Sequence, residues 1–332
     1  MNYEMISVAI RKAIEDHPND LAAYNDLLSL CRSWETEGFK AAHEVNKELR
    51  GLCARQVRAS DIKNAGRFYE VWRRSLLFDA PHDFDAFMTY IELDRKPEKR
   101  FYAPRRHYLK PMVQGFQDIL DGKLRLLTIS MPKRAGKSQT GINFVNMISG
   151  KYPDNATLME GTGDDLVKSF YNGCLEYLST PNEYLFYDVF PEARLVQTGA
   201  DTKIINLKSK SRFPTIMCRS IDARQVGLSE ATNVLYLDDC VEGREEAKNR
   251  QRLDDKWEVI SGDIMGRAIE GTPMVFTGTR YSIYDPIGRI QEYAEQQGWA
   301  WRAIEIPALD PITDESNYEY AVSYTHLTLP TT

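Results

Sequence analysis

The stretch LRLLTISMPKRAGKSQTGINFVNMIS, residues 124–149, decides the fold of this chain. Residues 124–130 are an apolar, β-prone run, which predicts a buried strand. Residues 132–137 predict a tight loop, and residues 138–149 carry apolar side chains at helical spacing. A strand, a loop that ends in Gly-Lys-Ser and a helix together form the context of a phosphate-binding loop, or P-loop.

Phosphate binding is the chemistry that this loop suggests. Backbone N–H groups of such a loop and of the helix N-terminus point at one spot and favour an anion there. Lys137 would add a positive charge near the β- and γ-phosphates of a nucleotide, and the Ser138 hydroxyl would bind Mg²⁺. The residues expected to contact the nucleotide are Pro132, Lys133, Arg134, Ala135, Gly136, Lys137, Ser138 and Gln139.

One position departs from the usual pattern G-x-x-x-x-G-K-S/T, because Met131 stands where the first glycine belongs. The alternative is therefore that Gly-Lys-Ser is an incidental loop. Lys133 and Arg134 add two cations, which either face a γ-phosphate or lie in solvent. The strand before the loop and the helix after it favour the phosphate-binding interpretation.

A second chemical element is the run NVLYLDD, residues 233–239. Four apolar residues followed by acids have the shape of a Walker B element, whose strand ends beside the P-loop in a parallel sheet. Asp238 would hold Mg²⁺, usually through water. Asp239 would orient or deprotonate the water that attacks the γ-phosphate in hydrolysis. The alternative is an ordinary strand followed by Asp239 as a helix N-cap.

A third element is the β-run TPMVFTGT, residues 272–279, which ends in Thr277, Gly278 and Thr279 and is followed by Arg280. Small residues and hydroxyl groups at the end of a strand suit a position near the γ-phosphate of a bound nucleotide. From that position, a change in the state of the nucleotide would be relayed to the protein. The alternative is an ordinary junction between a strand and a loop.

Composition narrows the class of protein. The chain has 332 residues, enough for two domains, and its shares of 42% apolar and 27% charged residues are typical of globular proteins. A net charge of −6 argues against general electrostatic binding to nucleic acid, so any such contact would be a local patch.

The five cysteines show no metal-ligand spacing, which predicts reduced thiols. We expect no membrane association and a cytoplasmic location, because no apolar run approaches a membrane span.

The chain divides into four predicted parts. Residues 1–94 predict a helical domain, because apolar residues recur at steps of three and four. Residues 95–122 open with seven basic residues against one acid, with Tyr102 among interleaved aromatic residues. This mixture suits a nucleic-acid backbone or a nucleotide, and the alternative is a solvated linker. Residues 123–311 predict an α/β domain with a doubly wound, mostly parallel sheet of the P-loop class, and residues 312–332 a linker and tail.

Four stretches resemble the ATPase domain of the large terminase subunit of tailed bacteriophages. They are YAPRRHYLKP with the downstream SMPKRAGKS, then NVLYLDDCVEGREEA, then VFTGTRYSIYDPIGRI, and finally WRAIEIPALDP. Together they span residues 101–311. The P-loop is generic, whereas the combination of LDD, GTRYS with DPIGR, and PALDP is more specific.

The resemblance implies a Mg²⁺-dependent ATPase that drives double-stranded viral DNA into a procapsid. It implies a homo-oligomeric ring that works with a portal protein and a small terminase subunit, in the host cytoplasm and transiently at the portal vertex. Residue by residue, Lys137 and Ser138 match Walker A, Asp238 and Asp239 match Walker B, and Thr277, Gly278 and Thr279 match the coupling motif, with Arg280 beside it. Arg134 is the candidate for an arginine at the γ-phosphate, with Lys133 second, and Tyr102 for the adenine side.

The chain departs from this family in two ways. Large terminase subunits continue into a two-metal nuclease domain, whereas residues 312–332 predict a truncated linker and a tail that is not native, so no nuclease activity is expected. Asp239 also replaces the more usual glutamate. Two other functions stay open: a P-loop helicase-like ATPase that remodels DNA, and a nucleotide-gated module that binds DNA or portal without turnover.

Overall fold

The computed structural model describes residues 2–38, 41–223, 229–309, 313 and 316–317. It divides into two compact units, Met1–Ile91 and Glu92–Thr332, so the division lies close to the predicted boundary at residue 94. Most of the predicted tail, residues 312–332, lies outside the described residues. No helix in the described part of the chain is both long and apolar enough to cross a membrane.

The described residues of the first unit form helices and the turns between them. The helices are α1 (Tyr3–Asp16), α2 (Leu21–Thr36), α3 (Ala41–Ala59), α4 (Ile62–Asp79) and α5 (Phe84–Tyr90). Three aspartates, Asp20, Asp61 and Asp83, cap α2, α4 and α5, because each side chain accepts a hydrogen bond from a backbone N–H of the first turn. The predicted periodicity is confirmed as a buried apolar face, with Leu27, Leu28, Leu49, Cys53 and Phe68 among its core residues.

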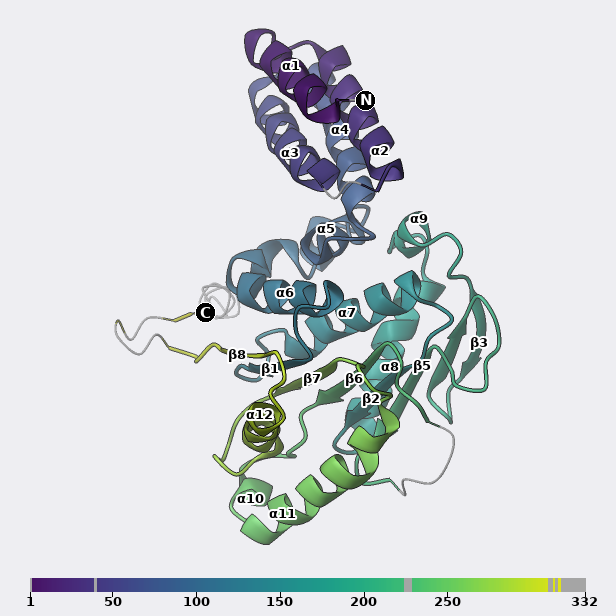
Figure 1. Cartoon of the computed structure of the whole chain (residues 1–332), viewed down its shortest axis with the longest axis vertical. Helices are drawn as coiled ribbons and strands as arrows, with labels where there is room; N and C mark the ends of the chain where they lie inside the picture. The colour runs from purple at the N-terminus through teal and green to yellow at the C-terminus, as the bar shows by residue number, and fades with distance from the viewer. Residues whose placement is uncertain (1, 39–40, 224–228, 310–312, 314–315, 318–332) are drawn as a thin grey trace, which may run out of the picture. The chain divides into compact units, whose positions relative to one another are not determined.

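The second unit is an α/β structure with an eight-stranded, mostly parallel sheet (Figure 1). The strand order is β3-β4-β5-β2-β6-β7-β1-β8. The strands are β1 (Leu126–Ser130), β2 (Thr157–Gly161), β3 (Leu195–Gly199), β4 (Ile204–Leu207), β5 (Ile216–Ser220), β6 (Val234–Asp238), β7 (Met274–Gly278) and β8 (Trp301–Glu305). Only β4 runs antiparallel to its neighbours β3 and β5 among the described pairings.

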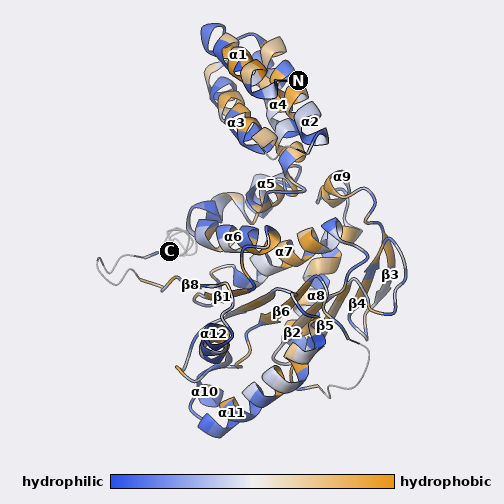
Figure 2. Ribbon diagram, in the orientation of Figure 1, coloured by the Kyte–Doolittle hydropathy of each residue, from blue (hydrophilic) through white to orange (hydrophobic). Residues whose placement is uncertain are grey.

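Helices cover both faces of the sheet, with α6 and α7 on one side and α11 and α12 on the other (Figure 1). The helical segments of this unit are η1 (Pro97–Lys99), η2 (Ala103–Arg105), α6 (Arg106–Leu120), α7 (Lys137–Lys151), α8 (Asp164–Ser179), α9 (Phe186–Val189), α10 (Arg244–Ala247), α11 (Arg250–Glu258), η3 (Val259–Ile264), η4 (Met265–Arg267) and α12 (Pro286–Gln296). Residues 140–150 of α7 are all buried, and Figure 2 shows hydrophobic residues along this helix, whereas α10 and α11 are mainly hydrophilic. A helix that is apolar on most sides is buried, whereas a polar one lies at the surface.

The register of three parallel strands positions the candidate site. β7 lies between β1 and β6, with Ser130 paired to Gly278 and Asp238 paired to Thr277. The carboxyl ends of all three strands therefore meet at one edge of the sheet. Crevices beyond the carboxyl ends of parallel strands are where open α/β sheets bind ligands.

Candidate functional site

The loop between β1 and α7 turns sharply through two residues with left-handed backbones. Arg134 has a φ of 66° and Gly136 a φ of 99°. Glycine adopts this region without steric cost. A Cβ at Gly136 would also lie 3.0 Å from Cζ of Phe101, so space as well as backbone conformation favours glycine here. The turn leads directly into α7, whose first residue is Lys137.

Lys137 is buried under the loop, with 4% of its surface exposed. Its ammonium donates to the carbonyl oxygens of Met131 at 2.8 Å and Pro132 at 3.1 Å, and to Oγ1 of Thr279 at 3.3 Å. Burial lowers the pKa of Lys137, and the nearby charges of Asp239 and Asp238 oppose that change. The lysine thus links the loop to the end of β7 and lies beside two acids.

Asp238, the last residue of β6, is fully buried. Its Oδ1 accepts a hydrogen bond from the Thr277 hydroxyl at 2.6 Å, whereas its Oδ2 has no partner among the described residues. Burial raises the pKa of Asp238 to about 6, and the charge of Asp239 adds to that rise. The hydroxyls of Thr277 and Ser138 and the charge of Lys137 oppose it.

These groups fit a bound Mg²⁺. A buried carboxylate oxygen without a partner is costly unless a cation or a donor completes it. Ser138, which lies close enough to lower the pKa of Asp238, contributes a hydroxyl oxygen. Mg²⁺ prefers such hard oxygen ligands and keeps several waters when a protein binds it. Asp238 and Ser138 are therefore the residues that would hold the metal.

Asp239 follows Asp238 in an unusual backbone conformation, with a φ of 42°. Three contacts hold it there. Its N–H donates to the carbonyl oxygen of Thr277 at 2.9 Å, its carbonyl oxygen accepts from the Thr162 hydroxyl at 2.6 Å, and its Oδ1 accepts from the N–H of Thr279 at 3.2 Å. A strained residue held by several contacts at the end of a strand is typical of a functional position.

The end of β7 contacts both the loop and the acids. The Thr279 hydroxyl donates to the carbonyl oxygen of Met131 at 3.1 Å and accepts from Lys137. The Thr277 hydroxyl donates to Asp238. A Cβ at Gly278 would lie 3.4 Å from Oδ1 of Asp239, so the absence of a side chain there lets the acid approach the strand. The structure thus brings together three elements that are separate in the sequence, with the acids about a hundred residues after the loop and the threonines about forty residues after the acids.

The predicted cations of this region differ in their surroundings. Arg134 and Lys133 are both exposed, and the ammonium of Lys133 lies 6.0 Å from the centre of the Tyr281 ring. Arg280 is half-buried and pairs with Asp285 at 3.4 Å and Glu305 at 3.7 Å. The exposed Arg134 is therefore more available to an incoming ligand than Arg280.

A cavity of about 740 Å³ lies beside the loop, at the ends of β1, β7 and β8. Its lining includes Met131, Pro132, Thr279, Arg280 and Tyr281. Volumes of this order are typical of sites for small molecules and cofactors. The start of the loop and the residues after β7 border this space, whereas Lys137, Ser138, Asp238 and Asp239 are not among its lining residues.

One of the predicted nucleotide contacts lies differently from the expectation. Tyr102 is only 1% exposed, so its ring does not offer a surface to a base, and the half-buried Phe101 is the aromatic residue against Gly136. Gln139 donates to the Tyr177 hydroxyl at 3.0 Å, and Ala135 is buried in the turn. The sequence places two aromatic residues side by side and carries no signal for which of them faces the loop.

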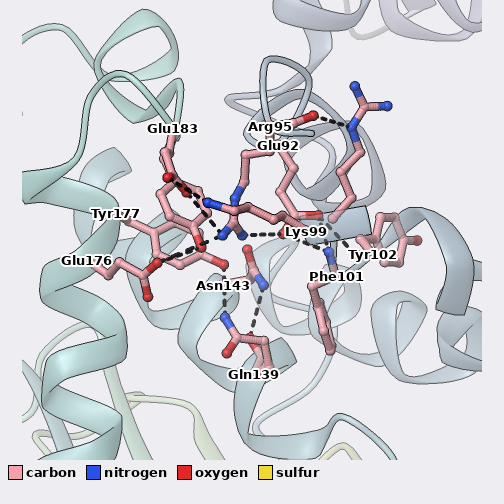
Figure 3. A network of polar contacts seen from close by, with 12 residues as sticks. Glu92, Arg95, Lys99, Phe101, Tyr102, Gln139, Asn143, Glu176, Tyr177 and Glu183 are labelled. Carbon is pink, nitrogen blue, oxygen red and sulfur yellow. Dashed lines mark hydrogen bonds and ion pairs between the residues drawn. The ribbon is translucent and has the colours of Figure 1, made fainter. Parts of the chain in front are cut away.

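The basic segment is engaged with the protein itself, as Figure 3 shows for Arg95 and Lys99. Arg95 lies 3.3 Å from Glu183 and 3.5 Å from Glu92, and its guanidinium stacks 4.3 Å from the Tyr184 ring centre. Lys99 also pairs with Glu183, at 3.2 Å. Arg100 donates to backbone carbonyl oxygens of residues 93 and 95, and Arg105 to that of residue 101. Arg95, Arg100 and Arg105 are half-buried and contact the protein itself, whereas Lys96, Lys99, Arg106 and Lys110 of the same segment are exposed.

Glu92 anchors this segment, although sequence reasoning did not single it out. It is 3% exposed, and its two oxygens accept hydrogen bonds from the N–H groups of Phe101 and Tyr102 at 2.9 to 3.1 Å (Figure 3). Burial raises the pKa of Glu92, while these hydrogen bonds and Arg95 oppose the rise. Glu92 therefore holds Phe101 in place beside Gly136.

No model of a known protein family matches this chain, and no curated protein is similar to it.

Proposed function

We propose that the chain is a Mg²⁺-dependent ATPase of the P-loop class and the motor subunit of a viral DNA-packaging machine, a large terminase subunit. One observation carries the nucleotidase part of this proposal. At the carboxyl edge of β1, β7 and β6, a buried lysine, two acids and a threonine that contacts the lysine converge on one glycine-containing turn. Positive and negative charges in this arrangement suit a metal-bound triphosphate.

Each residue has a defined part in the proposed hydrolysis. Lys137 leaves its carbonyl partners to contact the β- and γ-phosphates, and Arg134 adds charge at the γ-phosphate. Asp239 orients or deprotonates the attacking water. Asp238 and Ser138 hold Mg²⁺, which neutralises phosphate charge when bound. Positioned cations of this kind act on charge that develops in the transition state, and such effects are often worth several kcal/mol.

Coupling of a change at the γ-phosphate to movement of the protein would begin at Thr279. This residue contacts the carbonyl oxygen of Met131, the ammonium of Lys137 and, through its N–H, Asp239. A change at the γ-phosphate would alter these three contacts together and move the end of β7. Arg280 follows directly and would carry the change to Asp285 at the start of α12.

The packaging role rests on the family resemblance of residues 101–311. It supplies the proposed partners: double-stranded viral DNA, a portal protein, a small terminase subunit and further copies of the chain in a ring. The proposed location is the host cytoplasm and the portal vertex of the procapsid.

The first test is phosphate release by the purified chain with ATP and Mg²⁺, with and without double-stranded DNA. Lys137→Ala removes the ammonium at the proposed phosphate site and is expected to abolish release. Lys151→Ala is the matched control, because it changes the lysine at the opposite end of α7. Turnover in Lys137→Ala at the wild-type rate would contradict the assignment. Nucleotide binding without hydrolysis would indicate a gated binding module, and strand separation a helicase-like enzyme.

A further inference from the structure

Two histidines and a glutamate converge in the N-terminal helical unit, which contains none of the residues of the proposed ATPase site. Glu35 lies in the last turn of α2, His43 in the first turn of α3, and His82 in the turn between α4 and α5. Oε1 of Glu35 is 3.2 Å from Nε2 of His43 and 3.1 Å from Nε2 of His82. One ligand atom from each of the three residues lies within 4.8 Å of the others.

A buried carboxylate orients one of these histidines. Oδ1 of Asp79 lies 2.6 Å from Nδ1 of His43, and the Asp79 side chain is only 3% exposed and also pairs with Arg50. A carboxylate that accepts the Nδ1–H of an imidazole leaves the Nε2 lone pair to a ligand, which is how metal-bound histidines are commonly held. Phe78 stacks on the His43 ring at 4.9 Å between centroids, so packing also restrains the imidazole.

We propose that Glu35, His43 and His82 bind Zn²⁺, with Asp79 as the positioning residue for His43. Ligand atoms of a tetrahedral site with bonds of about 2.0–2.1 Å are about 3.3 Å apart, close to the two distances to Glu35. Two imidazoles and one carboxylate suit Zn²⁺, whereas Mg²⁺ and Ca²⁺ prefer oxygen ligands alone. The three side chains are 23% to 46% exposed, which leaves room for water as a fourth ligand.

Charge supports the same assignment. With both imidazoles neutral, Glu35 and Asp79 contribute two negative charges and Arg50 one positive charge, which leaves a net charge of about −1 for a dication to offset. The bound metal would join the end of α2, the start of α3 and the turn after α4. Because the unfolded chain does not hold these groups together, metal binding stabilises the folded unit.

The test uses the full chain, stripped of metal with EDTA and then titrated with Zn²⁺. We expect one Zn²⁺ bound per chain by calorimetry and a higher midpoint of thermal unfolding. Co²⁺ as a spectroscopic substitute should give the visible absorption of a tetrahedral site. His82→Ala removes the most exposed ligand and should abolish the Co²⁺ spectrum and the thermal shift. Asp79→Asn should weaken Zn²⁺ binding by about 10- to 100-fold.

His17→Ala is the matched control, because it removes an exposed histidine of the same unit that lies outside the cluster. It should bind Zn²⁺ as the wild type does. Three results would overturn the proposal: no Zn²⁺ binding, binding that His82→Ala retains, or binding that His17→Ala loses equally. A folding stability that responds to pH and not to Zn²⁺ would identify the cluster as an ion-paired set instead. None of these readouts depends on ATP turnover.

Discussion

Two buried carboxylates of the α/β unit differ in the partners that their oxygens find. Glu92 and Asp238 are 3% and 0% exposed, and burial raises the pKa of both. The two oxygens of Glu92 accept backbone N–H groups, and Arg95 lies beside them. Oδ2 of Asp238 has no partner in the described part of the chain. The two acids therefore differ in hydrogen-bond satisfaction and not in the direction of the pKa change, and under the proposed function the unsatisfied oxygen of Asp238 is the one that a metal would complete.

The same contrast extends to the cations. Arg95 is held by three glutamates and an aromatic ring, whereas the Lys137 ammonium contacts neutral oxygens only, beside two acids. Neutral carbonyl partners are weaker than charged ones, so a phosphate can replace them. We therefore expect substitutions in the first cluster to alter stability and those in the second to alter chemistry.

The largest expected effect concerns Asp239. Asp239→Asn should reduce phosphate release by about 10² to 10⁴-fold, because loss of a general base typically costs that much. Nucleotide binding should persist, since asparagine tolerates a left-handed backbone and its oxygen can still accept from Thr279. Phosphate release and binding of a fluorescent ATP analogue measure the two properties. Equal loss of both would mean that Asp239 is structural.

The next effect is on stability and concerns Glu92. Glu92→Ala removes the acceptors of two backbone N–H groups and one charged partner of Arg95, so we expect a loss of about 3 kcal/mol in the free energy of unfolding. Urea unfolding monitored by circular dichroism gives the value. Glu92→Gln, which keeps one oxygen acceptor, should lose less. Alanine and glutamine variants of equal stability would show that these hydrogen bonds do not anchor the segment.

The smallest effect has the opposite sign. Asp238→Asn should increase the free energy of unfolding at neutral pH, without nucleotide or Mg²⁺, by about 1 to 3 kcal/mol. A pKa raised from 3.8 to about 6 means that ionisation opposes folding, so this cost grows as the pH rises from about 4 to about 6 and then stays constant. The increase in the free energy of unfolding of Asp238→Asn over the wild type should therefore grow over the same pH range and then stay constant.

Urea titrations of wild type and Asp238→Asn below pH 4 and above pH 6 test this pH dependence of the free energy of unfolding. The variant should also lose Mg²⁺-dependent nucleotide binding. A variant less stable than the wild type at neutral pH would show that the Asp238 carboxylate is a partnered, structural acid, and would remove the contrast with Glu92.

Much of the site follows from local sequence patterns. The strand, turn and helix around Lys137 form as expected, because apolar periodicity and a glycine at φ of 99° are local signals. The acids at the end of β6 and the threonines at the end of β7 also lie where their runs predict. The buried Tyr102 beside the half-buried Phe101 shows the limit, because adjacent residues of similar chemistry are sorted only by packing.

By itself, the sequence determined the kinds of elements, their order and the chemistry at the ends of three strands, because each depends on neighbouring residues. Tertiary structure decided which strands lie side by side, that Glu92 holds the basic segment, and that Glu35, His43 and His82 meet. These outcomes depend on contacts between residues distant in the chain. Such contacts form only when the elements of each unit pack around its hydrophobic core, and no short pattern records them.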